Sequence, residues 1–462
     1  MNKNPIAAIA TPRGAGGVGI IRVSGPDLIG LAKTLLGTEP RPRFAHFLVL
    51  KDAHQEQIDQ VLLLFFKSPA SFTGEDIIEL HCHGGPRVTQ LVLNRVMELG
   101  SSDGVALAGP GEFSLRAFLN GKIDLVQAEA IADLINAQSD ASLRGATLSL
   151  SLQGRFSEQI NRLIDEITQL RILVESTLDF PEEEIEFIES ANAKQRLEKI
   201  MNDLDQIIKI SSQGKILRDG IRLALVGPPN VGKSSLLNTL VGEERAIVTP
   251  IAGTTRDRII ENISIDGIPV HLIDTAGIRD SQDVVEQIGV AQTWDEITKA
   301  DIILLMHDVT KAPDVNFGDI ETKVRACAHS GAHILTVMNK LDLLERQQTG
   351  QIKDVAITKQ IYISAKTGEG IDQLKETILR FAGWEGNADG GIYTARTRHL
   401  QAILVAKDHL QKAMTHGFGG NRVLELFAEE LHCAQNYLGE ITGKLLPDDL
   451  LGKIFSEFCI GK

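Results

Sequence analysis

Residues 227–234 read Gly227-Pro228-Pro229-Asn230-Val231-Gly232-Lys233-Ser234, a match to the pattern G-x-x-x-x-G-K-[ST]. An apolar run, Ile221–Val226, precedes this stretch and is typical of a buried parallel strand. The run Ser235–Leu240 follows and is typical of a helix start. A glycine loop between strand and helix turns backbone N–H groups and the positive end of the helix dipole toward an anion. The sequence therefore predicts a phosphate-binding loop, with Lys233 at the β- and γ-phosphates and the Ser234 hydroxyl on Mg²⁺.

A second motif indicates that the bound base is guanine. Asn339-Lys340-Leu341-Asp342 follows the apolar strand Ile334–Met338, and open α/β sheets bind ligands at the carboxyl ends of their strands. The carboxylate of Asp342 can accept hydrogen bonds from guanine N1–H and N2–H₂, a pair of donors that adenine lacks. Ser364-Ala365-Lys366 lies downstream, and we expect its backbone to present an N–H group to the guanine O6.

Two more segments complete the expected ligands of GTP and Mg²⁺. Asp274-Thr275-Ala276-Gly277 follows the strand Val270–Ile273, and Asp274 would hold a water molecule on Mg²⁺. Thr255 would supply the second hydroxyl ligand of Mg²⁺, beside Ser234. In this order the motifs resemble a small G-protein domain. The predicted GTP-binding residues are Asn230, Val231, Gly232, Lys233, Ser234, Ser235, Thr249, Thr254, Thr255, Asp274, Thr275, Ala276, Gly277, Asn339, Lys340, Asp342, Ser364, Ala365 and Lys366.

The residue after Gly277 is Ile278, where Ras-like proteins carry the glutamine that orients the attacking water. An aliphatic side chain cannot do this, so either hydrolysis is very slow or another group substitutes. Asn230 can offer an oxygen to a monovalent cation, and the loop 249–254 can surround that cation with carbonyls. The predicted K⁺ ligands are Asn230, Thr249, Ile251 and Thr254. A K⁺ ion would stand in for an arginine finger, which contributes roughly 10³–10⁵ in rate.

Composition bounds the class of protein. The 462 residues predict two to four domains, and the net charge of −14 argues against a broad grip on a nucleic-acid backbone. Four cysteines, without a C-x-x-C pair, indicate neither a disulfide framework nor a zinc site. The chain has neither a signal-peptide layout nor an apolar run of about 18 residues, the length of a membrane helix, so we expect a cytosolic protein.

Two short motifs are weaker than they look. Gly14–Gly19 spells G-x-G-x-x-G but is followed by a strand-like run instead of a helix, so we expect a hairpin loop and no dinucleotide site. His81-Cys82-His83 resembles a metal site, but only alternate side chains of a strand share a face. We therefore favour an ordinary strand there.

The chain as a whole predicts a multidomain α/β protein. Residues 1–118 alternate strands and helices, as in an α+β domain, and residues 119–215 are helical. The G domain is expected at 216–383, followed by helices at 384–462. Because a short helical tail forms a thin core on its own, we expect it to pack on the helices before residue 215. The Ras-like G domain would then be inserted into a discontinuous helical domain. Two apolar seams carry the helical prediction: Phe156, Ile160, Leu163, Ile167, Leu170 and Val174, and Leu197, Ile200, Leu204 and Ile207.

Taken together, these features resemble the MnmE (TrmE) family of the TrmE-Era-EngA-YihA-Septin-like GTPases. The supporting motifs span the chain: Gly16-Gly17-Val18-Gly19-Ile20, Phe72-Thr73-Gly74-Glu75-Asp76, His83-Gly84-Gly85-Pro86, Gly109-Pro110-Gly111-Glu112-Phe113-Ser114 and Cys459-Ile460-Gly461-Lys462. The resemblance implies a GTPase with Mg²⁺ and K⁺. It also implies an N-terminal dimerisation domain holding 5-formyltetrahydrofolate or a related tetrahydrofolate at Arg22, Glu79, Lys122 and Lys462.

The same resemblance implies a role in tRNA modification. The homodimer would work with an FAD-containing partner, MnmG (GidA), to add a carboxymethylaminomethyl-type group at C5 of the wobble uridine. Beside Lys233, a further catalytic residue would be Glu286, which falls where the family has a glutamate that orients the attacking water. The competing hypothesis is a ribosome-assembly GTPase of the Era or Der type. Der-like chains carry two sets of G motifs and Era-like chains end in a KH module, whereas here Gly417-Phe418-Gly419-Gly420 lies in an acidic helical tail. A binding switch without useful hydrolysis would fit Ile278.

Cys459 has two interpretations. Its apolar neighbours Phe455, Phe458 and Ile460 are consistent with a buried structural thiol. The functional interpretation is that the tail brings Cys459 and Lys462 toward the folate pocket, where the thiol attacks the pyrimidine or only positions substrate or partner. Under that interpretation Cys459 is a catalytic candidate.

Overall fold

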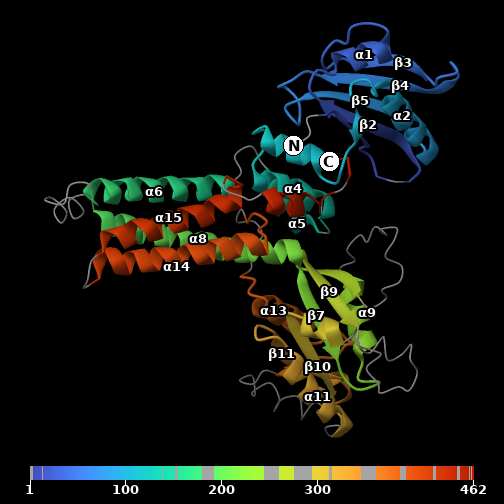
Figure 1. The fold of residues 1–462 in the computed structure, drawn as a ribbon. Helices are drawn as coiled ribbons and strands as arrows, with labels where there is room; N and C mark the ends of the chain where they lie inside the picture. Colours follow the sequence, from blue (N-terminus) through green and yellow to red (C-terminus); the bar gives the residue numbers. More distant parts are fainter. Residues whose placement is uncertain are drawn as a thin grey trace. The chain divides into compact units, whose positions relative to one another are not determined.

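The structure is a computed structural model that describes residues 4–12, 14–137, 139–150, 155–178, 192–243, 260–274, 294–311, 315–344, 360–385, 392–419, 423–444, 448–456, 458 and 460–461. The chain divides into two compact units (Figure 1). The first comprises Met1–Ala132, Ile160–Ile164 and Gln435–Lys462, and the second comprises Asp133–Gln159 and Asp165–Ala434. Among the helices of the described ranges, none is long and apolar enough to cross a membrane.

A mixed sheet forms the centre of the first unit. Neighbouring strands are antiparallel except β1 and β6, which are parallel. Buried and exposed residues alternate along most of β4, as expected where the two faces of a strand meet different surroundings. The strands, in the spatial order β3-β4-β5-β2-β1-β6, are β1 (Ile6–Ile9), β2 (Gly16–Gly25), β3 (His46–Lys51), β4 (Gln57–Phe66), β5 (Asp76–Gly84) and β6 (Ala106–Leu107).

The glycine-rich stretch near the N-terminus differs in part from the sequence prediction. Gly16–Gly19 belong to β2 instead of the hairpin loop, while the absence of a following helix agrees with the prediction. The reason is a close approach between β2 and β5: a Cβ atom on Gly84 would lie 2.6 Å from the Gly16 carbonyl oxygen. Glycine is therefore needed at Gly84 for this contact, and also at Gly19, where a Cβ would lie 2.3 Å from Cγ2 of Thr89, whereas a Cβ on Gly16 or Gly17 would meet no close atom.

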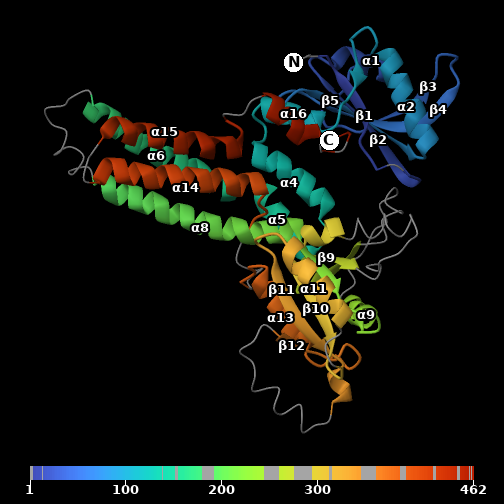
Figure 2. The same ribbon diagram turned by 60° about the horizontal axis from the view of Figure 1, so that its bottom comes forward.

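Helices cover parts of both faces of this sheet. α1 (Ile29–Leu36) and α2 (Pro86–Leu99) pack on one face, burying Leu31 and Val92 against the strands (Figure 2). On the opposite face α3 (Glu112–Leu119) buries Phe113 against Ile6 and Ala8. Each face of the sheet therefore contributes to its own hydrophobic core.

A C-terminal helix completes the first unit. α16 (Asp448–Ser456) packs against α3 and the start of α4 (Leu125–Asn136), with Phe455 beside Phe118. Beyond α16, Ile460 forms a bridge with Pro110. The last described residues of the chain are therefore anchored on the N-terminal part of the sequence.

Long helices form much of the second unit. They are α5 (Asp140–Leu150), α6 (Arg155–Leu178), α8 (Ala193–Asp219), α14 (Thr397–Phe418) and α15 (Leu424–Thr442), of which residues 160–164 in α6 and 435–442 in α15 belong to the first unit. All the residues of the two predicted apolar seams are buried. α6, α8, α14 and α15 lie side by side in both views (Figures 1 and 2). Because α8 packs along α14, helices from before and after the intervening sheet lie together.

The intervening residues form a second, mainly parallel sheet. Of the strands in the described ranges, only β8 runs antiparallel, paired with β9 at one edge. α13 (Ile371–Phe381) packs on one face and α11 (Val315–Cys327) on the other, so the sheet is covered on both sides, as expected for an α/β fold. The strands, in the spatial order β12-β11-β10-β7-β9-β8, are β7 (Ile221–Val226), β8 (Ile260–Ile265), β9 (Ile268–Asp274), β10 (Ile302–Asp308), β11 (His333–Asn339) and β12 (Gln360–Tyr362).

One residue joins the long helix α8 to the central strand β7. Gly220 has φ +69°, and a Cβ there would lie 2.8 Å from Nε2 of His271 on β9. That nitrogen donates to the carbonyl oxygen of Asp219, 3.0 Å away. Burial lowers the pKa of His271 below its ordinary value, although the Asp219 carbonyl opposes the shift.

Candidate functional site

The phosphate-binding motif lies between β7 and α9 (Lys233–Glu243), in the strand–loop–helix context that its chemistry requires. Two residues of the loop have positive φ angles, Asn230 at 60° and Gly232 at 101°. A Cβ on Gly232 would lie 2.3 Å from Nδ2, the side-chain amide nitrogen, of Asn339. Only glycine therefore fits this position of the loop.

The loop holds its cationic residue in place. Lys233 Nζ donates to the carbonyl oxygens of Gly227, at 2.6 Å, and Pro228, at 3.1 Å. Ser234 and Ser235 are exposed in the first turn of α9. An ammonium group and exposed hydroxyls at a helix N-terminus are donors and ligands suited to phosphate and a hard cation.

The guanine motif is tied to the phosphate loop by one buried amide. Asn339 is 2% exposed; its Nδ2 donates to the Val231 carbonyl oxygen at 2.8 Å, and its Oδ1 accepts from the Ala365 N–H at 3.0 Å. This side chain therefore connects the loop 227–232, the end of β11 and the segment 364–366. The structure brings together three motifs that are more than a hundred residues apart at the extremes.

The other residues of the guanine motif are anchored as well. Ser364 Oγ donates to Asp342 Oδ1 at 2.6 Å, which holds the carboxylate at the edge where β11 ends. Lys340 Nζ lies 2.7 Å from Oδ2 of Asp308, the last residue of β10. Asp308 was missed by the sequence analysis. Its signal was available: it is a carboxylate at the end of an apolar strand, where ligand sites of α/β sheets form.

Several predicted nucleotide ligands lie outside the described residues: Thr249, Ile251, Thr254, Thr255, Thr275, Ala276, Gly277 and Glu286. Asp274 is the last residue of β9, and only its backbone placement is described. It ends beside the phosphate loop, because β9 pairs with β7 and Asp274 lies in register with Leu225. The K⁺ ligands, Asn230 included, and both Mg²⁺ hydroxyls, those of Ser234 and Thr255, therefore remain predictions.

In the first unit, two of the predicted folate residues form an ion pair. Arg22 on β2 and Glu79 on β5 are register partners, and Arg22 Nε donates to Glu79 Oε1 at 2.8 Å. His81 Nε2 lies 3.4 Å from the other oxygen of Glu79. The Arg22 guanidinium lies 5.8 Å from the ring centroid of Phe113. The side chains of Arg22, Glu79 and His81 form a half-buried polar row at the edge of the sheet face that α3 covers.

The C-terminal tail reaches this pair. The Gly461 carbonyl oxygen lies 3.5 Å from Arg22 Nη1. Gly461 has φ +96°, and a Cβ there would lie 2.5 Å from the Ile9 carbonyl oxygen, so glycine permits the approach. Cys459 and Lys462 lie outside the described residues. Lys122 donates instead to the Pro69 carbonyl oxygen at 3.0 Å.

Comparison with known proteins identifies the family. The model described as "MnmE helical domain" matches residues 125–459, and that described as "GTP-binding protein TrmE N-terminus" matches residues 5–122. The "tRNA modification GTPase MnmE" of Polynucleobacter asymbioticus is 54% identical over 100% of this chain and 99% of its own. The chain belongs to the MnmE family. The MnmE of Bordetella petrii is 50% identical over 99% of this chain and 98% of its own. A solved structure of Aquifex aeolicus Era with GDP and AlF4⁻ is 29% identical and covers 41% of this chain and 66% of its own, at a TM-score of 0.28, too low to support an argument about the fold.

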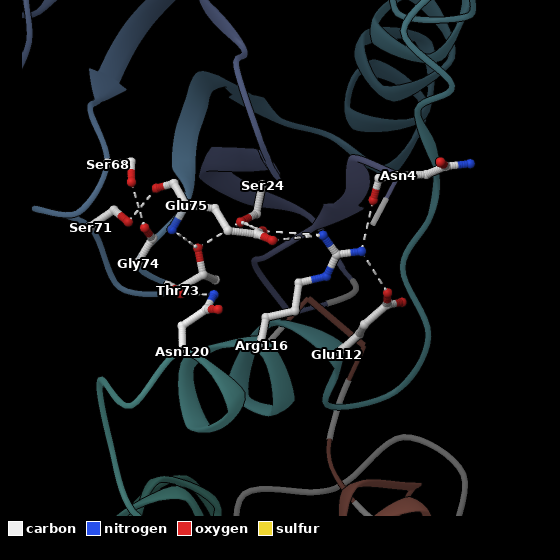
Figure 3. Close-up of polar contacts among 10 residues, drawn as sticks. All are labelled: Asn4, Ser24, Ser68, Ser71, Thr73, Gly74, Glu75, Glu112, Arg116 and Asn120. Carbon is white, nitrogen blue, oxygen red and sulfur yellow. Dashed lines mark hydrogen bonds and ion pairs between the residues drawn. The ribbon is translucent and has the colours of Figure 1, made fainter. Parts of the chain in front are cut away.

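Two motifs that carried the resemblance to the MnmE family meet in one partly buried network (Figure 3). Arg116 on α3 is 8% exposed, and its Nη1 donates to Glu75 Oε2 at 3.1 Å. Its Nη2 donates to Glu112 Oε1 at 3.0 Å and to the Asn4 carbonyl oxygen at 2.8 Å. Ser24 Oγ donates to Glu75 at 2.8 Å.

This network was also missed from sequence, although both motifs had been noted. One guanidinium faces two carboxylates here, so Arg116 is the cation that permits both to be partly buried. The network fixes α3, which carries Phe113, against the strand that carries Arg22 and Ser24. In this MnmE family member, the two motifs therefore support the part of the sheet that carries Arg22, the residue that the C-terminal tail contacts.

Proposed function

We propose that this chain is a GTPase that acts in the modification of tRNA. The single observation that carries the proposal is the Asn339 link, which holds the guanine motif, the phosphate loop and the segment 364–366 as one site. The similarity to proteins called tRNA modification GTPases extends over the whole chain, which favours this function over ribosome assembly.

In the proposed GTP site, Lys233 binds the β- and γ-phosphates and Asp342 binds guanine. Ser234 and Thr255 bind Mg²⁺, with Asp274 acting through a water molecule. The exposed hydroxyl of Ser234 at the start of α9 fits a hard, oxygen-preferring cation. Mg²⁺ bound there would neutralise charge between the phosphates.

We further propose that hydrolysis depends on K⁺ and on Glu286. Asn230 is exposed in the loop, with a side-chain oxygen that suits K⁺, and Thr249, Ile251 and Thr254 would provide the other ligands. Glu286 would orient the attacking water in place of a glutamine at Ile278. The G domains of two subunits of a homodimer would pair across the cation.

For the tRNA reaction, we propose that Arg22, Glu79, Lys122 and Lys462 hold a tetrahydrofolate one-carbon donor. The half-buried Arg22–Glu79 pair fits the polar groups of a pterin, because it offers a cation and a carboxylate acceptor side by side. The partner would be the FAD-containing MnmG, and the product a carboxymethylaminomethyl-type group at C5 of a wobble uridine. Cys459 would act close to that uridine. We accordingly propose that the protein acts in the cytoplasm.

The proposed domains are 1–118, 119–215, 216–383 and 384–462. α8 and β7 meet at Gly220, close to the proposed start of the G domain. The helical parts 119–215 and 384–462 would form one discontinuous domain, which the packing of α8 on α14 supports.

The test of the proposal has two measurements. Purified protein should hydrolyse GTP much faster in KCl than in NaCl at equal ionic strength, since Na⁺ is too small for a cage sized to K⁺. Equal rates in the two salts would refute the proposed dependence on K⁺. The absence of turnover in either salt would refute the proposed GTPase activity. In cells that lack the gene, expression of the chain should restore the modified wobble uridine, measured by mass spectrometry of tRNA nucleosides; failure of an expressed chain to restore it would refute the tRNA role.

A further inference from the structure

Two parallel strands bring an unassigned carboxylate to the guanine motif. β10 and β11 pair in parallel, and Asp308, the last residue of β10, is the register partner of Asn339. The Val309 N–H donates to the Asn339 carbonyl oxygen at 3.0 Å, which extends the pairing past the strand end. Asp308 therefore lies next to the residue that begins the guanine motif.

The carboxylate of Asp308 is buried and fully engaged. Its side chain is 7% exposed, and Oδ2 lies 2.7 Å from Lys340 Nζ. Oδ1 accepts from the hydroxyl of Thr310 at 2.6 Å and from its N–H at 3.1 Å. Lys311 is 4.0 Å away and 70% exposed, so it is a weak competitor for the carboxylate. Burial alone would raise the pKa of Asp308, but the hydrogen bonds from Lys340 and Thr310 hold it below its ordinary value.

The backbone of Lys340 also needs support. Lys340 has φ +71°, the left-handed region that a residue with a Cβ adopts rarely. Its neighbours in the motif are each held by a hydrogen bond, Asn339 to Val231 and Asp342 to Ser364. Asp308 supplies the corresponding anchor for Lys340.

We propose that Asp308 is a positioning residue for nucleotide binding: it holds the ammonium group of Lys340 so that the lysine's methylene stem forms one wall of the guanine site. A lysine stem is apolar and flexible, and it can present a surface to a flat base only when its charged end is fixed. The inference rests on the proposed binding of GTP. It assigns no contact between Asp308 and the nucleotide.

The experiment measures binding of fluorescent mantGTP and mantGDP to the full chain. Asp308→Asn keeps the size of the side chain and should raise the Kd for both nucleotides about tenfold, the worth of a charge-assisted hydrogen bond. Lys340→Met, which keeps the stem and removes its anchor, should raise the Kd as much. The double variant should be no worse than either single variant, because both changes break the same contact. At saturating GTP, the kcat of the Asp308→Asn variant should stay near that of the unmodified chain.

A matched control comes from the other end of the same strand. Asp301 accepts the Arg222 N–H at 2.8 Å, far from the guanine motif along β10, so Asp301→Asn should leave the Kd unchanged. If the unmodified chain binds no nucleotide, the proposed function itself fails. If it binds and Asp308→Asn does not weaken binding, or if the two changes add in the double variant, the role of Asp308 is wrong. Should Asp308→Asn not fold, Lys340→Met alone decides: an unchanged Kd overturns the proposal.

Discussion

Asn339→Ala isolates the contact that joins the guanine motif to the phosphate loop. The substitution removes a side chain that is 2% exposed and leaves two buried backbone groups without it, the Val231 carbonyl and the Ala365 N–H. A buried polar group that loses its partner costs about 1–3 kcal/mol. With two such groups, we expect the free energy of unfolding to fall by about 2–6 kcal/mol. In a cooperative unit of about 150–250 residues this lowers Tm by roughly 4–24 °C.

Tryptophan fluorescence is a suitable assay, because it reports on this part of the chain alone. The two tryptophans are Trp294 and Trp384, and both pack into the cores of the parallel sheet. Thermal unfolding of the nucleotide-free full chain, followed at these residues, gives the shift. GTP should also bind more weakly, since the motifs are no longer held in register.

A control removes a single hydrogen bond to the same segment. Thr239 Oγ1 donates to the Ala365 carbonyl oxygen at 2.8 Å, so Thr239→Val should lower Tm by only a few degrees, in line with about 1 kcal/mol for one bond. A shift in Asn339→Ala no larger than that of Thr239→Val would refute the view that Asn339 links the site.

Three further predictions address the base, the junction and the thiols. Asp342→Asn should weaken GTP binding and favour xanthosine nucleotides, whose base reverses the hydrogen-bond polarity; unchanged GTP affinity would remove Asp342 from the base site. Because the pKa of His271 is lowered in the folded state by burial, the unfolded chain takes up the proton more readily below about pH 6.5, so stability should fall as pH drops through that range. His271→Gln should weaken this dependence of stability on pH, measured by fluorescence-monitored denaturant titrations at several pH values, whereas the exposed His329→Gln should leave it unchanged. The same pH dependence in both variants would contradict the argument. Burial raises the pKa of Cys82 to about 11, so mass spectrometry should find the exposed Cys327 alkylated by iodoacetamide at pH 8 long before Cys82, and similar rates would show that Cys82 is not buried.

Local patterns made much of the fold predictable. The seam that includes Leu163 and Ile167 needed only helical periodicity, and both residues are fully buried. The phosphate loop needed only a strand before it and a helix after it. In each case the information lies within a few turns of helix or a few residues of strand.

Contacts between distant segments were not predictable in the same way. The Asp308–Lys340 pair exists because β10 lies beside β11 in the sheet. The spatial order of strands cannot be predicted from the sequence of either strand alone. Arg116 meets Glu75 because α3 covers the face of the sheet that carries Ser24. Both motifs around Arg116 were visible as patterns, but a pattern does not say which charge its residues face. The prediction for Gly16–Gly19 failed for a similar reason, since the stretch pairs with β5, a strand distant in the sequence.

The direct joint between α8 and β7 gives the helix the geometry of a lever arm. α8 has 27 residues and is therefore about 40 Å long. Its last carbonyl is held by His271 on β9, the strand that ends at Asp274, and Gly220 is the only residue between helix and sheet. A rotation of about 5° at this joint would move the far end of such a helix by about 3.5 Å. A displacement too small to notice within the sheet would thus be magnified, by length alone, into one large enough to change side-chain packing at the remote end of the helix.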